Sequence, residues 1–309
     1  MTKNSILARL PYIPEKFESL ETAESRNKTL IGWLCRQESD EAIELAASLY
    51  ACSELKLSHC NSGACHVCLR SNRLRMLKEI QPYIEQSLSS EFVTVIPVGL
   101  TVPRGELETV DMKDVVKRIA KGLRHILPRN VIAIGGIDVS INSLANEGFE
   151  WVVHSHIIVL NYSDEPTAKA VRSRLQERFK LRADCNKALR IEDVKTGDEY
   201  KVASYGLKSI FNWRSGFWIG DDFSPRARKG RPKKYTPKRQ DEVELRLWLA
   251  RLAAADRLVL VGVTNPAGPE SIRLRDTPRT PKAPKTSEGL AQAKARVTRS
   301  EGVTRGKPR

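Results

Sequence analysis

Apolar and polar residues alternate with a period of two in several separate stretches of the chain, a period that is typical of β-strands. These stretches are 92–98 (FVTVIPV), 131–142 (VIAIGGIDVSIN), 151–160 (WVVHSHIIVL) and, more briefly, 188–194 (ALRIEDV). Apolar residues recur with a helical period in 110–127, 167–180 and about 200–211. The pattern therefore predicts the element order β-α-β-β-α-β, followed by a last helix.

A turn at Asn146–Gly148 joins the second and third strands as a hairpin. With a helical connection on either side of that hairpin, the expected fold is α+β: an antiparallel sheet with helices on one face, plus the last helix. The expected domains are an N-terminal helical region with a cysteine-rich element (1–90), a main domain (91–224), a basic linker (225–240), a helix and strand that pack on the main domain (241–264), and a disordered basic tail (265–309).

The charge is distributed unevenly along the chain. Residues 225–309 contain 22 Lys and Arg against 8 Asp and Glu, so +14 of the net charge of +15 lies there. Such a polycation favours nucleic acid, and we expect single-stranded and double-stranded DNA as partners. Within it, the segment KGRPK resembles an AT-hook, and its alternative interpretation is an unstructured basic linker. The candidate DNA contacts are Lys229, Arg231, Lys233 and Lys234.

No apolar run is long enough to span a membrane, and the N-terminus lacks the pattern of a secretory signal. We therefore expect a cytoplasmic protein without a membrane partner. Four of the six cysteines lie within 52–68, which favours a structural zinc site over disulfides. The predicted zinc ligands are Cys60, Cys65 and Cys68, with either Cys52 or His59 as the fourth.

His154 and His156 project from the same face of the predicted strand, because side chains of a strand repeat every two residues. Two imidazoles so placed can bind one metal ion. The hairpin brings the strand 131–141 alongside, and we expect Asp138 as the third ligand, with Glu150 as the alternative. A mixed imidazole and carboxylate site acting on a phosphodiester suits Mg²⁺ or Mn²⁺.

Tyr205 and Lys208 lie one turn apart on the predicted last helix, which places a phenol and an ammonium on one face. A tyrosine hydroxyl is a weak nucleophile at neutral pH, and a neighbouring cation can stabilise the phenolate or balance the charge of a phosphate. Tyr200 lies about 140° further round the helix, so we do not expect it to share the site. The pair indicates a tyrosine nucleophile that attacks a phosphodiester.

These motifs together resemble the HUH endonuclease superfamily, and specifically the rolling-circle replication initiators of plasmids and related mobile elements. The resemblance rests on the strand FVTVIPV, on His154 and His156, on Tyr205-x-x-Lys208, and on the upstream cysteines. It implies metal-dependent nicking and rejoining of origin DNA through a 5′-phosphotyrosine intermediate, in the single-tyrosine branch, with host replication proteins as further partners. Ser155 departs from the family's pattern, which has a hydrophobic residue between the histidines.

Two other classes of function remain open at this point. The chain could be a non-catalytic DNA-binding regulator that uses a zinc module and a basic tail, with the histidine strand packed in the core. It could also be a zinc hydrolase that uses His154 and His156. Neither alternative explains why a Tyr-x-x-Lys sequence follows the histidine strand.

Overall fold

The computed structural model describes residues 17–56, 59–97, 99–128, 131–144, 148–161, 165–178, 189–206, 208, 213–214 and 239–262. They form two compact units. The sheet unit holds Phe17 and the described residues of 73–238 and 256–273, and the helical unit holds those of 18–72 and 239–255. In this described part of the chain, no helix is long and apolar enough to cross a membrane. Cys185, the AT-hook-like residues 229–234 and the tail 265–309 lie outside it.

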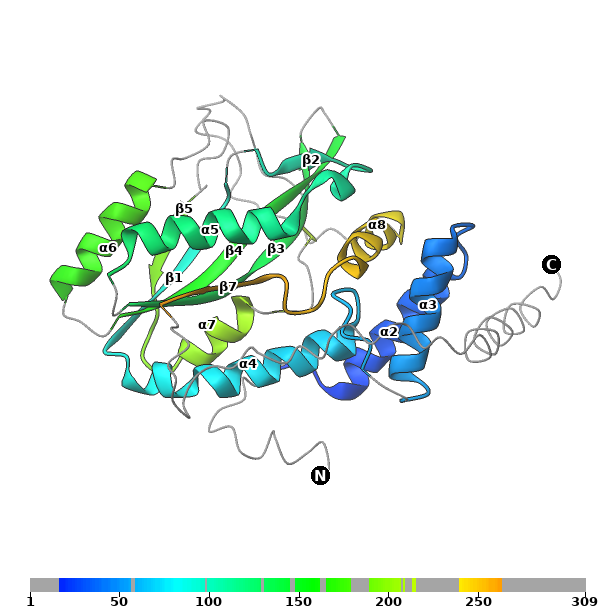
Figure 1. Ribbon diagram of the computed structural model, residues 1–309, viewed down its shortest axis with the longest axis horizontal. Coiled ribbons are helices and arrows are strands. Elements are labelled where there is room, and N and C mark those ends of the chain that lie inside the picture. Colours follow the sequence, from blue (N-terminus) through cyan, green and yellow to red (C-terminus); the bar gives the residue numbers. More distant parts are fainter. Residues whose placement is uncertain are drawn as a thin grey trace, which may run out of the picture. The chain divides into compact units, whose positions relative to one another are not determined.

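The sheet unit is built on a mainly antiparallel sheet, which confirms the predicted α+β class (Figure 1). Its strands run in the order β5-β1-β4-β3-β6, while β2 pairs with β4 and β7 pairs with β3. Only the short pairing between β3 and β6 is parallel among the described strands. The strands are β1 (Ser89–Val95), β2 (Thr101–Pro103), β3 (Ile132–Leu144), β4 (Gly148–Asn161), β5 (Leu189–Asp193), β6 (Trp213–Arg214) and β7 (Leu258–Val261).

The long hairpin of β3 and β4 sets the register of the candidate site. Its strands pair from Leu144 opposite Gly148, and this register places Asp138 opposite His154. Residues that face each other across two strands project from the same side of the sheet. Every residue of β4 from Trp151 to Leu160 is buried, so both faces of the sheet are covered at this point.

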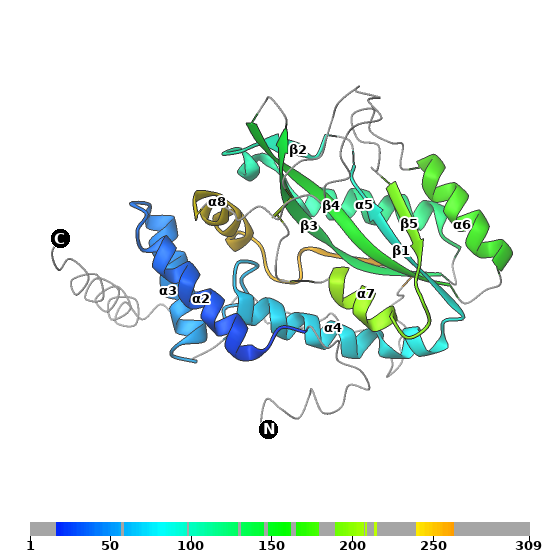
Figure 2. The same cartoon turned by 180° about the vertical axis from the view of Figure 1, so that it is seen from behind.

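Helices lie on both faces of the sheet (Figures 1 and 2). Helices α5 (Met112–Ile126) and α6 (Glu165–Arg178) cover one face, and α7 (Glu199–Gly206) lies against the other. Helices α5 and α6 of the predicted β-α-β-β-α-β unit therefore share one face, and the additional last helix, α7, lies on the opposite face. The Asp111 side chain caps α5 by accepting hydrogen bonds from the backbone amides of Lys113 and Asp114. The short helix η1 (Leu107–Thr109) precedes α5.

The helical unit contains α2 (Leu20–Leu34), α3 (Asp40–Ser53) and α8 (Arg239–Ala250), together with the start of α4 (His66–Gln86). Ser39 caps α3, and its side chain accepts a hydrogen bond from the Ala42 backbone amide. The loop before α4 pairs with the segment after α8: Ala254 N–H donates to the Asn61 carbonyl, and Gly63 N–H donates to the Leu252 carbonyl. A distant part of the sequence therefore fixes the conformation of the cysteine-rich loop.

Candidate functional site

Three of the predicted site residues converge on one point of the sheet unit. The Nε2 atoms of His154 and His156 lie 3.1 Å apart, and Asp138 Oδ2 lies 3.3 Å from each of them. All three side chains are buried. The three ligand atoms form a group that could hold a metal ion. Glu150, the alternative carboxylate, lies four residues before His154 on the same strand, about 13 Å away, and is not part of this group.

The second nitrogen of each imidazole makes a contact that orients its ring. His154 Nδ1 lies 3.2 Å from the Val152 carbonyl oxygen, and His156 Nδ1 lies 3.0 Å from Thr94 Oγ1 on β1. With Nδ1–H donating to these oxygens, Nε2 of each ring keeps its lone pair for a ligand bond. Phe92 stacks on the His156 ring, with centroids 5.4 Å apart and planes at 14°. These contacts hold the two rings in an orientation that points both Nε2 atoms at Asp138 Oδ2.

The charges at this point favour an ionised carboxylate beside a neutral imidazole. Burial opposes the charged form of Asp138, but the Lys208 ammonium and His154 outweigh it and hold the pKa of the carboxyl well below its usual range. Burial lowers the pKa of His156 to about 4, although its hydrogen bond to Asp138 acts in the opposite direction. Both groups are therefore in the protonation state of a metal ligand at neutral pH.

Tyr205 and Lys208 lie beside the three ligand atoms. The Lys208 ammonium donates to the Tyr205 hydroxyl at 3.3 Å and lies 2.6 Å from Asp138 Oδ2. The Tyr205 ring meets the His156 ring edge-on, with centroids 4.9 Å apart. The predicted helix over 200–211 is too long, because α7 ends at Gly206 and Lys208 follows it. Glycine favours helix termination, and the two side chains still meet.

Two glycines that the sequence did not single out allow α7 to approach the sheet. A Cβ atom added at Gly206 would lie 2.7 Å from the His156 carbonyl oxygen, and one added at Gly136 would lie 2.7 Å from the Gly206 carbonyl oxygen. Any larger residue at either position would push the helix and the strands apart. The backbones of α7 and the strands approach each other closely at these two glycines. This close approach allows the Tyr205 side chain to reach the histidines.

Arg257 is a further residue that the sequence did not reveal. Its buried guanidinium donates to the Ile137 carbonyl and to the Lys208 carbonyl, each at 3.2 Å. It therefore ties the backbone of Lys208 to β3, next to Asp138. No local pattern marks this arginine, because it lies 49 residues after the lysine that it positions.

Tyr200 faces away from the ligand atoms. Its hydroxyl donates to a Glu85 carboxylate oxygen on α4 at 3.4 Å. Burial and the neighbouring Glu85 raise the pKa of Tyr200 to about 12. The separation of Tyr200 and Tyr205 around the helix is as expected from the sequence.

The helical unit brings four cysteines together. Cys52, Cys60, Cys65 and Cys68 form a second group that could hold a metal ion. The sulfur atoms of Cys52 and Cys68 lie 3.6 Å apart, those of Cys60 and Cys68 lie 3.7 Å apart, and those of Cys52 and Cys65 lie 3.8 Å apart. His59, the alternative fourth ligand, is not a member of the group, although its Nδ1 lies 3.8 Å from Cys68 Sγ.

Amide groups donate to the sulfur atoms of this cluster. Asn27 Nδ2 donates to Cys65 Sγ at 3.3 Å, and Asn61 N–H donates to Cys68 Sγ at 3.3 Å. Hydrogen bonds among the thiols lower the pKa of the Cys52 thiol, first through Cys60, and raise the pKa of the Cys65 and Cys68 thiols, first through Cys52. Amide donors of this kind stabilise thiolates and orient metal ligands.

Comparisons with known proteins give no match: no protein-family model, no curated protein and no solved structure matches the chain.

Proposed function

We propose that the sheet unit is a metal-dependent DNA endonuclease and strand transferase of the HUH type, with Tyr205 as its nucleophile. One observation carries the proposal: a carboxylate and two imidazoles converge within 3.3 Å of one another, beside a tyrosine hydroxyl that a lysine ammonium contacts. The resemblance of the motifs extends the proposal to initiation of rolling-circle replication on a plasmid or related mobile element.

The strand order supports this assignment. Taken in chain order, the four strands of the predicted β-α-β-β-α-β unit are β1, β3, β4 and β5, and in the sheet they lie in the order β5-β1-β4-β3. This strand order is typical of a split β-α-β unit, and it supports the RRM-like core that we propose. It places the histidine strand β4 at the centre of the unit, between β1 and β3.

The spacing of the three ligand atoms fits one divalent cation. Separations of 3.1 to 3.3 Å are those of atoms that each lie about 2 Å from a common ion. Mg²⁺ or Mn²⁺ is the proposed ion, because the reaction is at a phosphodiester. When bound, such an ion polarises the P–O bonds of the scissile phosphate and leaves positions open for its oxygens.

Tyr205 supplies the nucleophile. Its oxygen forms a bond to phosphorus, the bond from phosphorus to the 3′ oxygen breaks, and the phenol proton ends on the departing 3′-hydroxyl. The products are a 5′-phosphotyrosyl enzyme and a free 3′ end. One phosphodiester replaces another, so the reverse reaction can rejoin a strand without ATP. Tyr200 is a poor alternative, because its pKa of about 12 disfavours the phenolate.

Lys208 balances charge during this step. Its ammonium already contacts the Tyr205 oxygen, and a pentacoordinate phosphate adds negative charge at the same place. Arg257 acts as a positioning residue, because it holds the Lys208 carbonyl. Lys208 also lies 2.6 Å from Asp138, so it links the nucleophile with one of the metal ligands.

For the four cysteines we propose a structural zinc ion. A tetrahedron with Zn–S bonds of about 2.3 Å has edges of about 3.8 Å. The three sulfur separations of 3.6, 3.7 and 3.8 Å agree with that edge. An ion held there would join α3, the cysteine-rich loop and the start of α4, and so stabilise the helical unit.

The test is the formation of a covalent adduct. The full chain is incubated with Mn²⁺ and a pool of random-sequence single-stranded oligonucleotides, labelled at the 3′ end because that portion of the strand stays joined to the enzyme. We expect a labelled protein band on a denaturing gel. Tyr205→Phe should abolish the band, whereas Tyr200→Phe, which makes the same chemical change on the same helix, should keep it.

Other outcomes would favour the other functions. DNA binding without an adduct in the unmodified protein would favour a non-catalytic regulator. Cleavage that leaves no protein-linked product would favour a hydrolase. An adduct that persists in Tyr205→Phe would overturn the assignment of the nucleophile.

A further inference from the structure

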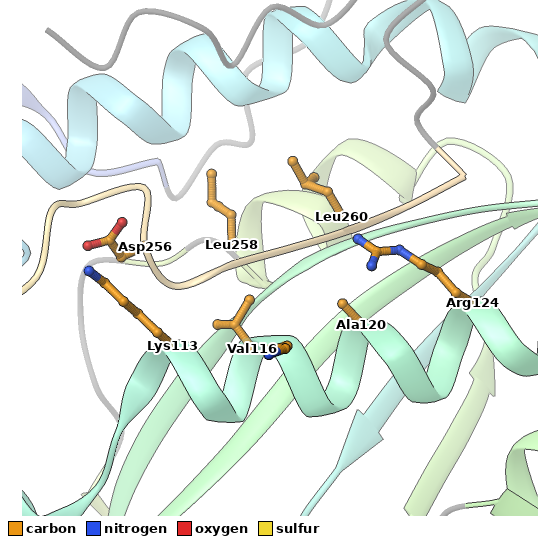
Figure 3. Close-up of a pocket in the computed structure, with 8 residues that line it drawn as sticks. Lys113, Val116, Ala120, Arg124, Asp256, Leu258 and Leu260 are labelled. Atoms are coloured by element: carbon orange, nitrogen blue, oxygen red, sulfur yellow. The ribbon is translucent and has the colours of Figure 1, made fainter. Parts of the chain in front are cut away.

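A hollow of about 350 Å³ lies between α5 and the strand β7 (Figure 3). Its floor is apolar, with Val116 and Ala120 from the helix and Leu258 and Leu260 from the strand. Its rim is mainly cationic. Lys113 and Arg124 lie at opposite ends of the hollow, Lys117 also lines it, and Asp256 lies on the rim beside Lys113 (Figure 3).

A second hollow of about 330 Å³ continues the same face. It is lined by Lys121, Arg124 and His125 of α5 and by Arg178 of α6. Arg124 belongs to both hollows, so they adjoin. The two together form one basic face along α5, which we call the α5 face: Lys113, Lys117, Lys121, Arg124, His125 and Arg178.

The cations of the α5 face have no carboxylate partner among the residues that the structure describes. On the same helix, by contrast, Arg118 pairs with Asp114 at 3.8 Å. Lys113, Lys117 and Lys121 are spaced four residues apart, so their like charges repel along the helix. Like-charge pairs at this spacing destabilise a helix. An anionic ligand would remove that repulsion.

We propose that the α5 face binds the phosphate backbone of double-stranded DNA. The row from Lys113 to Arg124 spans 11 residues of helix, about 16 Å, which matches about five phosphates along the axis of one strand. Among the residues that the structure describes, no Phe, Tyr or Trp lines either hollow, and single-stranded DNA is bound through stacking on such rings. The apolar floor offers a surface for the aliphatic stems of the lysines, which leaves their ammonium groups at the rim.

The position of the α5 face separates it from the candidate active site. Helix α5 lies on one face of the sheet and α7, with Tyr205, lies against the other (Figures 1 and 2). A duplex on the α5 face would therefore leave the catalytic face open for the single strand. This inference rests on the proposed function in one respect, that the substrate is DNA, and it adds a duplex-binding surface to the nuclease.

The test compares two triple variants of the full chain that carry the same change in charge. Lys113→Gln, Lys117→Gln and Lys121→Gln together remove cations of the α5 face. The matched control combines Arg118→Gln, Arg190→Gln and Lys201→Gln, which are exposed and paired with Asp114, Glu192 and Asp198. Fluorescence anisotropy measures the affinity for a labelled duplex of about 20 base pairs over a range of salt concentrations.

We expect the α5-face variant to bind at least about tenfold more weakly at low salt, with the slope of log K against log salt reduced by about 2.7, which is about 0.9 for each phosphate contact. The control should change neither value appreciably. Both variants keep the basic tail, so the difference between them reports the α5 face alone. Equal effects in the two variants, or no effect in either, would overturn the proposal.

Three further measurements identify the cause of any loss. Circular dichroism must show both variants folded, and both should form the covalent adduct with single-stranded DNA at the rate of the unmodified chain. Failure of the adduct in the unmodified chain would refute the proposed nuclease and leave the duplex measurement standing. If the α5-face variant lost binding to phosphatidylserine vesicles but kept duplex binding, the partner would be a lipid surface and the proposal would be wrong.

Discussion

Gly206→Ala tests whether close contact between α7 and the sheet sets the position of the nucleophile. The added Cβ atom would lie 2.7 Å from the His156 carbonyl oxygen. Ordinary contacts begin at 3.4 Å, so the helix must retreat by about 0.7 Å. The φ angle of Gly206 is not in the left-handed region, so alanine meets no conformational strain there. The substitution therefore tests the contact without adding backbone strain.

This retreat moves Tyr205 away from its two neighbours. The Tyr205 hydroxyl now lies 3.3 Å from the Lys208 ammonium, and its ring centroid lies 4.9 Å from that of His156. A displacement of about 1 Å in a reacting group costs about a hundredfold in rate. We expect adduct formation in Gly206→Ala to slow by about ten- to a hundredfold. Overpacking costs about 1–3 kcal/mol, which the better helix propensity of alanine offsets by up to about 1 kcal/mol.

The assay is single-turnover adduct formation at saturating single-stranded DNA, with urea denaturation to measure the free energy of unfolding. Gly32→Ala is the matched control, because Gly32 also lies in a helix and no atom lies within 4 Å of its added Cβ. The control should keep the full rate. If a folded Gly206→Ala variant also formed the adduct at full rate, the close contact would have no part in positioning Tyr205.

The remaining predictions concern the two candidate metal groups. Cys65→Ser should lose the bound zinc, measured by mass spectrometry, and unfold the helical unit, whereas Cys35→Ser, outside the cluster, should keep both. In the metal-free protein, the pKa of His156 is lower in the folded state than in the unfolded state, so the unfolded state binds more protons than the folded state between pH 6.5 and about 4. The free energy of unfolding should therefore fall by up to about 3 kcal/mol as the pH decreases through that range, and His156→Gln should flatten the fall in urea titrations. Lys208→Met should bind Mn²⁺ at least about tenfold more tightly by calorimetry, because a cation 2.6 Å from Asp138 is removed, while adduct formation slows.

The ligand group was predictable because it depends on two local rules. Side chains of a strand repeat every two residues, which put His154 and His156 together. A short turn fixes the neighbour of a strand, which brought Asp138 opposite His154. The cysteine cluster followed from spacing alone, and the structure includes Cys52 rather than His59 in the group.

The residues that the sequence did not reveal act across long distances in the chain. Thr94 orients His156 from 62 residues away, and Arg257 holds Lys208 from 49 residues away. No periodicity reports such contacts, because they depend on how strands and helices pack. The end of α7 is a different case. Glycine favours helix termination, so Gly206 indicated an end of the helix. The spacing of Tyr205 and Lys208, however, was equally consistent with a helix that continues to Lys208.

One strand connects the two halves of the candidate site. Strand β3 carries Asp138, and two residues earlier it carries Gly136, which lets the backbone of α7 reach the sheet. The same strand therefore positions one ligand atom and the approach of Tyr205, so a displacement of β3 would move both. Lys208 lies beyond the end of α7 and contacts both Asp138 and Tyr205. A substitution that displaces β3 should thus impair metal binding and adduct formation together, whereas one at Lys208 should separate them.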